Sequence, residues 1–333
     1  MIRYSSTGKA VAKAAPVSET ELIESIEAVS AAAVDCVECG IAIESIVQCM
    51  DNVQLAMTAI KNGGLTKQTV ATFNGSGELS AFLGQESLTV AGLEAYAADQ
   101  IKALSGKYVE GLEGKMAEYW AKFVAFMKNL WSKIVNWFKG LFTNRAKFVN
   151  ALKEGGDVTE EQFNKNKDKE FTLIGVKDPA KLTPLYDALV AEITKCAAAV
   201  KTKSATALAP EPEFNEKVIT EFEEQFGQGA KAKISERYSN ATEFNKVVSG
   251  CRELCGNQKL MVASKDINEA FKKIVQDAGV AANAADDKKA ELKDAINARR
   301  DTLNKLLKAC RVEARYCMKW SSQLLTIKRA LQK

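Results

Sequence analysis

The chain has 333 residues, of which 47% are hydrophobic and 26% are charged, and its net charge is +4 at pH 7. It contains no histidine, which excludes the usual general base at physiological pH, Ser-His and Cys-His nucleophile pairs, and Cys/His zinc sites. It also has no glycine-rich phosphate loop and no apolar run of the roughly 18–20 residues that would span a membrane. These exclusions favour a non-enzymatic protein without a cofactor or a metal site.

The N-terminal third of the chain is predicted to be helical. A capping box at Ser18 and Glu21 begins a long helix, which ends at the glycine pair Gly63 and Gly64. A short helix follows, and a second long helical pattern runs from residue 87 to about 115. Because the chain has only five prolines and no sustained strand-like alternation, we predict an all-α fold, built as an elongated bundle of long amphipathic helices.

Residues 119–142 combine aromatic, apolar and basic side chains on one amphipathic helix. Three of the four tryptophans lie here, and no acidic residue occurs between Glu118 and Glu154. The stripe of apolar residues, spaced by three and four positions, comprises Trp120, Phe123, Met127, Trp131, Ile134, Phe138 and Phe142. Such a helix either buries its stripe against other helices or lays it into a membrane interface with the lysines outward. Periodicity favours the buried helix, and the aromatic content keeps membrane contact open as the alternative.

The C-terminal half is also predicted to be mainly helical. It begins with a charged connector at 153–170. The run 171–176 is the only strand-like segment, and it is too isolated to build a sheet. Helices then resume at about 181–203, and a proline-containing hinge at 209–212 separates them from further helices that extend to about residue 280.

The last helix is predicted to begin near Asp286. Its apolar positions step by three and four residues from Leu303 to Leu331, and Glu313 interrupts them. This spacing is typical of a coiled-coil-like seam, which would pack against the rest of the bundle or against a second copy of the chain.

Eight cysteines occur at positions 36, 39, 49, 196, 251, 255, 310 and 317. Several are three, four or seven residues apart, which is the spacing of one helix face, so we predict buried thiols that pack as small hydrophobic side chains. A four-cysteine metal site from Cys36, Cys39, Cys251 and Cys255 is a less favoured alternative, because zinc-binding cysteines usually lie on turns. Disulfide bonds between the cysteines are a further alternative.

Charge is distributed unevenly along the chain. Residues 1–86 hold five basic and ten acidic residues, a net charge of −5, so the remainder carries +9. Residues 291–333 alone have eleven basic and four acidic residues. This arrangement is expected of a protein that contacts a polyanion late. In its precursor, the acidic N-terminal segment would shield the charge of the basic body. The candidate contacts to DNA phosphates are Arg299, Arg300, Lys305, Lys308, Arg311 and Arg315. No motif predicts sequence-specific recognition.

The order of segments over residues 19–150 resembles internal head proteins of large tailed bacteriophages. The likeness rests on an acidic, alanine-rich helix, the Gly-Gly-Leu-Thr turn at 63–66, the Leu-Gly-Gln-Glu-Ser-Leu junction at 83–88 and the Lys/Trp/Phe helix. In that family a prohead protease cuts after a glutamate that has a hydrophobic residue shortly upstream. The resemblance therefore implies cleavage between Glu86 and Ser87, which would remove the acidic segment.

We therefore expect a non-enzymatic structural component of a phage virion, made in the bacterial host cytoplasm and placed in the phage head. Its expected partners are other virion proteins, itself, and packaged DNA without sequence preference. A membrane-active helical protein and a capsid or tail subunit are the alternatives. The expected organisation is an acidic segment at 1–86, an aromatic and basic region at 87–152, a connector at 153–180 and a helical domain at 181–333.

Overall fold

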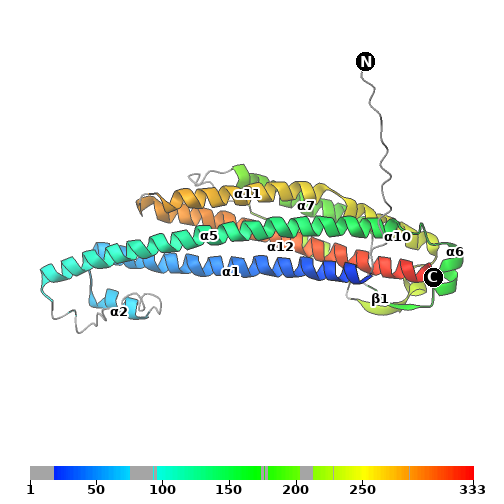
Figure 1. Cartoon of the computed structure of the whole chain (residues 1–333), viewed down its shortest axis with the longest axis horizontal. Coiled ribbons are helices and arrows are strands. Elements are labelled where there is room, and N and C mark those ends of the chain that lie inside the picture. The colour runs from blue at the N-terminus through cyan, green and yellow to red at the C-terminus, as the bar shows by residue number, and fades with distance from the viewer. Residues whose placement is uncertain are drawn as a thin grey trace, which may run out of the picture.

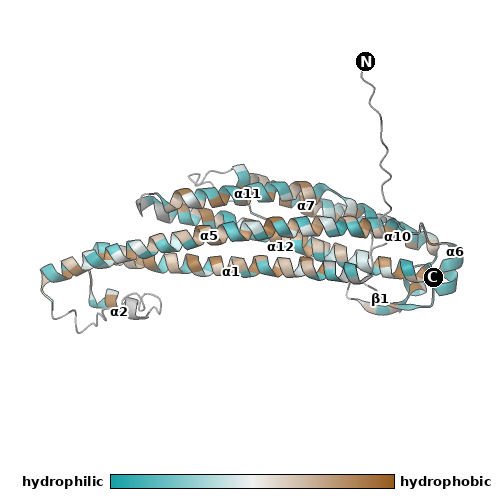
Figure 2. Ribbon diagram, viewed as in Figure 1, coloured by the Kyte–Doolittle hydropathy of each residue, from teal (hydrophilic) through white to brown (hydrophobic). Residues whose placement is uncertain are grey.

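The computed structural model describes residues 19–75, 93, 96–173, 176, 179–202, 213–227, 229–284 and 286–333. Over these ranges the chain forms an elongated bundle of long helices with two short strands at one end, which confirms the predicted all-α fold (Figure 1). Hydrophilic and hydrophobic residues alternate along the long helices, as expected where one side of each helix is buried (Figure 2).

Helices α1 (Glu19–Gly63) and α5 (Ala98–Lys153) lie side by side and antiparallel along the length of the bundle (Figure 1). As predicted, α1 ends at its glycine pair, where Gly64 has a φ of +68° and its N–H donates to the Ile60 carbonyl at 2.8 Å. The short helix α2 (Lys67–Gly75) follows. Helix α5 begins at Ala98 and continues unbroken through the predicted 119–142 helix, whereas the start of the helical pattern predicted from residue 87 lies outside the described residues.

Four further helices complete the bundle: α7 (Pro179–Thr202), α10 (Ala241–Gly256), α11 (Lys259–Ala282) and α12 (Asp286–Leu331). Helix α12 begins at the predicted residue and packs against α5, α7, α10 and α11. Its apolar positions, including Leu303 and Leu331, are buried. A coiled-coil geometry for this helix stays a prediction.

The predicted connector at 153–170 contains a helix, α6 (Glu160–Asn166), so the prediction of a plain connector is wrong. Its N-terminus is a capping box: the Gln162 N–H donates to Thr159 Oγ1 at 3.2 Å, and the Thr159 N–H donates to Gln162 Oε1 at 3.0 Å. The Asn166 side chain then donates to the Leu331 carbonyl at 3.1 Å, which joins this helix to the end of α12.

The expectation that the strand-like run builds no sheet is also wrong. Strand β1 (Glu170–Leu173) pairs antiparallel with β2 (Ala230–Lys233), with Glu170 opposite Lys233. The partner strand has the sequence Ala-Lys-Ala-Lys, which carries no strand signal of its own. Two short helices flank it along the chain, α8 (Lys217–Glu223) and α9 (Ile234–Arg237).

A buried lysine ties the C-terminal ends of α5 and α12 together. Lys328 is 2% exposed, and its Nζ donates to the carbonyls of Leu152 at 2.6 Å and Glu154 at 2.8 Å. These are carbonyls at the end of α5, where a cation also meets the negative end of the helix dipole. The contact fixes the end of α5 that carries the candidate site.

Candidate nucleic-acid interface

The aromatic stripe of α5 lies mostly inside the bundle. Five of its seven members belong to the hydrophobic core that α5 shares with α1: Trp120, Phe123, Met127, Ile134 and Phe138. Trp131 and Phe142 are half-buried. Helix α1 contributes Ile43, Met50 and Val53 to the same core, and the Cys39 thiol donates to the Phe126 carbonyl at 3.7 Å. The structure thus places the stripe as the buried-helix interpretation expects. Little of the stripe is exposed to contact a membrane.

The outward side of α5 forms a polar face that we did not predict as a site from the sequence. We call it the lysine face, and its members are Lys128, Asn129, Ser132, Asn136, Lys139, Thr143, Lys147, Asn150 and Lys153, all exposed. Their spacing puts them within about a third of the helix circumference. The face has four lysines and no acid. The signal that could have found it is the absence of acidic residues between Glu118 and Glu154.

All four lysines of this face are free to meet a ligand. Within the part of the chain that the structure describes, Lys128, Lys139, Lys147 and Lys153 form no ion pair. Their neighbours on α5 are engaged: Lys122 bonds Glu118 at 2.8 Å, and Lys133 lies 3.7 Å from Asp35 of α1.

The pairing around Glu118 marks the boundary of the lysine face. Hydrogen bonds from Lys115 and Lys122, and the charges of these two lysines, lower the pKa of this exposed carboxyl to about 2. Glu118, the last acid before the lysine face, therefore stays ionised and is paired with lysines of its own helix.

The six basic residues predicted on α12 divide into buried and exposed groups. Arg299 is 1% exposed and donates to Asp277 of α11 at 2.8 Å, and Arg300 is buried beside Asp301 at 3.0 Å. Neither faces solvent, because both side chains hold structural ion pairs.

The other four predicted residues reach the surface to different degrees. Lys305 and Lys308 are exposed and share Glu216, at 3.8 and 3.0 Å. The hydrogen bond and charge of Lys308 lower the pKa of Glu216. Arg311 is half-buried, and Arg315 is exposed with its guanidinium 5.6 Å from the Tyr316 ring centroid.

Glu313, which interrupts the apolar spacing of α12, forms a buried ion pair with Arg145 of α5. The glutamate is fully buried and the arginine is 3% exposed. Burial raises the pKa of Glu313, against the opposing effect of the Arg145 charge. Burial also lowers the pKa of Arg145, but the Glu313 charge together with the nearby Cys317, Tyr186 and Cys255 side chains outweighs it, and the net pKa lies above the ordinary value.

The cysteines are free thiols, and seven of the eight are buried, as predicted. The two halves of the alternative metal site have different surroundings: Cys39 bonds the α5 backbone, whereas Cys251 and Cys255 lie 3.3 and 2.9 Å from Ser321 Oγ of α12. Among the described residues, no group of three or more ligating side chains could hold a metal ion. The four-cysteine site is therefore not formed. Burial raises the pKa of Cys36 to about 11, as it does for Cys196.

The suggested cleavage residues, Glu86 and Ser87, lie outside the described residues. In the part of the chain that the structure describes, no helix has a stretch apolar and long enough to cross a membrane.

The fold and the site define an elongated helical protein with a buried aromatic core and a basic outer face. The chain belongs to the family of phiKZ-like phage internal head proteins, whose family model matches residues 18–237. No curated protein and no solved structure shows significant similarity to it. Family membership places the protein in the phage head, as a structural component associated with other parts of the virion.

Proposed function

We propose that the lysine face of α5 contacts packaged DNA through its phosphates, without sequence preference. The observation that carries the proposal is the row of exposed lysines, Lys128, Lys139 and Lys147, on a face that has no acid and holds them free of ion pairs. Lysine ammonium groups bind phosphate oxygens as point charges, and the asparagine, serine and threonine side chains between them add hydrogen bonds.

The geometry of the face suits a duplex. Residues 128–153 span about 38 Å at a rise of about 1.5 Å per residue, which is close to one turn of B-DNA, about 34–36 Å. A rigid helix of this length can therefore follow neighbouring phosphates along one side of a duplex. Because it presents no recognition motif, the contact depends on charge and is weakened by salt.

Helix α12 offers a weaker second contact in this proposal. Arg311 and Arg315 reach the surface. Lys305 and Lys308 are paired with Glu216, so they bind a phosphate only when it replaces the Glu216 carboxylate as their partner. Arg299 and Arg300 are left out, because both are buried.

Charge reversal on the lysine face tests the proposal. We expect the variant Lys128→Glu, Lys139→Glu, Lys147→Glu to bind duplex DNA more weakly at every sequence. The slope of log affinity against log salt should fall in magnitude by about three, about one for each lost phosphate contact. Fluorescence anisotropy with two unrelated duplexes between low and moderate salt provides the measurement.

A matched control separates the face from net charge. Lys246, Lys265 and Lys272 are exposed lysines on α10 and α11, and changing all three to glutamate alters the net charge equally. The control should retain most of the salt slope. An equal loss in both variants would show that overall charge, rather than the lysine face, carries the binding.

We also propose that cleavage between Glu86 and Ser87 cuts the covalent connection between the acidic α1 and the basic body during head maturation, as the family resemblance implies. Helix α1 carries eight acidic residues and one lysine, and it packs along α5. Because its buried residues share the core of α5, cleavage alone leaves α1 bound unless another surface replaces it.

The intact mass of the protein from purified particles tests the cleavage. The expected result is a chain that begins at Ser87, with or without a separate N-terminal fragment. A chain that retains residues 1–86 covalently in mature particles would contradict it.

Membrane contact by the aromatic stripe has less support than DNA contact. The stripe could reach a lipid surface only after α1 left the bundle, since five of its seven residues are buried in the shared core. Association with a second copy has support from exposed apolar residues on the outer side of α1, Val34, Val37 and Ile41.

A further inference from the structure

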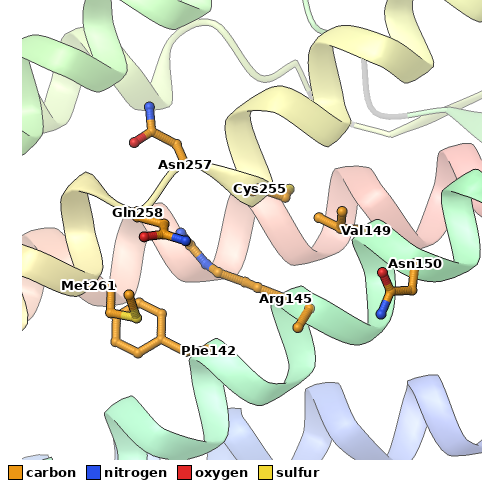
Figure 3. Close-up of a pocket in the computed structure, with 10 residues that line it drawn as sticks. Phe142, Arg145, Val149, Asn150, Cys255, Asn257, Gln258 and Met261 are labelled. Carbon is orange, nitrogen blue, oxygen red and sulfur yellow. The ribbon is translucent and has the colours of Figure 1, made fainter. Parts of the chain in front are cut away.

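A pocket of about 250 Å³ opens between α5 and the junction of α10 and α11 (Figure 3). Its wall includes Phe142 and Met261 on one side, and Arg145, Cys255 and Gln258 around its interior. The lining contains one cation and no acidic residue. This part of the molecule takes no part in the DNA contact described above, except that Asn150 belongs to both surfaces.

Arg145 supplies hydrogen-bond donors that the protein does not use. Its side chain runs from α5 toward Gln258 at the helix junction (Figure 3). Its Nη2 is held by Glu313. The Nε and Nη1 atoms are buried, and neither makes a hydrogen bond of normal geometry to a residue that the structure describes, although the Tyr186 hydroxyl lies near the guanidinium. Buried guanidinium donors without an acceptor are costly, so an acceptor in the pocket would be bound favourably.

The N-terminus of α11 faces the same pocket. Gln258 is its N-cap residue, and the Gln258 side chain makes no capping hydrogen bond. Asn257 Oδ1 accepts from the Lys259 N–H at 2.9 Å, and no acidic residue occurs in the first turn. The positive end of a 24-residue helix dipole therefore lies beside Arg145, and no carboxylate of the pocket lining balances it. Two acids lie behind the lining: Glu313 pairs with Arg145, and Asp187 pairs with the Lys259 side chain at 2.7 Å.

We propose that this pocket binds a small oxyanion of the phosphate class between Arg145 and the N-terminus of α11. A cation would meet the positive end of the helix dipole and find no acidic residue in the lining, and an apolar ligand would leave the arginine donors unpaired. A phosphate group provides acceptors for both the guanidinium and the backbone N–H groups of the first turn. The phosphate is either a free ion or a group of the DNA backbone.

Thermal unfolding of the full chain, with inorganic phosphate exchanged for chloride at constant ionic strength, tests the proposal. A ligand that binds only the folded state stabilises it by RT ln(1 + [L]/Kd), so Tm rises with the logarithm of the ligand concentration above Kd. We expect phosphate to raise the Tm of the wild type. Gln258→Glu places a carboxylate at the pocket while it favours the helix N-terminus, so this variant should fold and bind phosphate about tenfold more weakly or worse.

Two further variants make the result specific. Gln258→Met removes the side-chain amide without adding charge and should keep the phosphate response. The double variant Arg145→Met, Glu313→Met removes the arginine together with its partner, so that no buried charge is left uncompensated. This variant should lose the phosphate response. If Gln258→Glu and the double variant both respond to phosphate as the wild type does, the proposal is overturned.

Duplex DNA identifies the source of the phosphate. If Gln258→Glu also weakens DNA binding, the pocket takes a backbone phosphate. If DNA affinity is unchanged while the phosphate response is lost, the pocket takes the free ion. Loss of DNA binding in the Lys128, Lys139, Lys147 variant with an intact phosphate response separates this site from the lysine face.

Discussion

Replacing Glu313 by leucine is expected to lower the free energy of unfolding by about 3–5 kcal/mol, because it leaves the Arg145 guanidinium buried without its counter-charge. Glu313 is fully buried, and its second oxygen accepts from the Cys317 thiol at 3.2 Å, so the leucine variant also loses this hydrogen bond. Urea unfolding followed by circular dichroism measures the change through the shift in midpoint.

The double variant Arg145→Leu, Glu313→Leu is the control for this prediction. Removing both charges leaves an apolar contact between α5 and α12, and such replacements are often neutral or stabilising. The double variant should therefore recover most of the stability that Glu313→Leu loses. If the two variants were equally destabilised, the pair would contribute through packing rather than through charge.

Replacing Phe138 by alanine is expected to cost about 3–5 kcal/mol, the usual loss when a large aromatic side chain leaves a cavity in a core. Phe138 is 3% exposed, with its ring 4.7 Å from that of Trp137 and stacked on that of Phe142 at 5.9 Å. Phe142 lies on the same stripe but is half-buried, so Phe142→Ala should cost distinctly less.

The same pair of variants distinguishes a core helix from a membrane-facing one. Chemical unfolding gives the two stabilities, and flotation with uncharged phosphatidylcholine liposomes, which the lysine face does not attract, gives lipid binding by the stripe. The bundle predicts a large difference in stability and no lipid binding by either variant or by the wild type. Equal, small losses of stability together with loss of liposome binding would contradict a buried stripe.

Much of the fold could be predicted from local signals. The end of α1 follows from its glycine pair and the start of α12 from the pattern near Asp286, because helix ends depend on a few neighbouring residues. The sheet could not be predicted: β2 is a short Ala-Lys-Ala-Lys segment that becomes a strand only because β1 lies beside it. Pairing of segments about 60 residues apart leaves no local trace in the sequence.

The candidate site was predictable only in part. An arginine on a helix can face solvent or a buried acid, and sequence alone does not reveal that Asp277 lies opposite Arg299. Glu313 was visible as an interruption of an apolar pattern, but its partner Arg145 is on a helix 168 residues earlier. The lysine face had a local signal, the long absence of acids, because an exposed helical face is determined by the sequence of one helix.

The central claim is that the lysine face meets DNA inside the head, and cross-linking in intact particles tests it most directly. Particles are irradiated to join protein to DNA, and the peptides that carry nucleotide are identified by mass spectrometry. The account predicts cross-links concentrated in the part of α5 that contains Lys128, Lys139 and Lys147. Cross-links confined to other surfaces of the protein, with none on this part of α5, would contradict it.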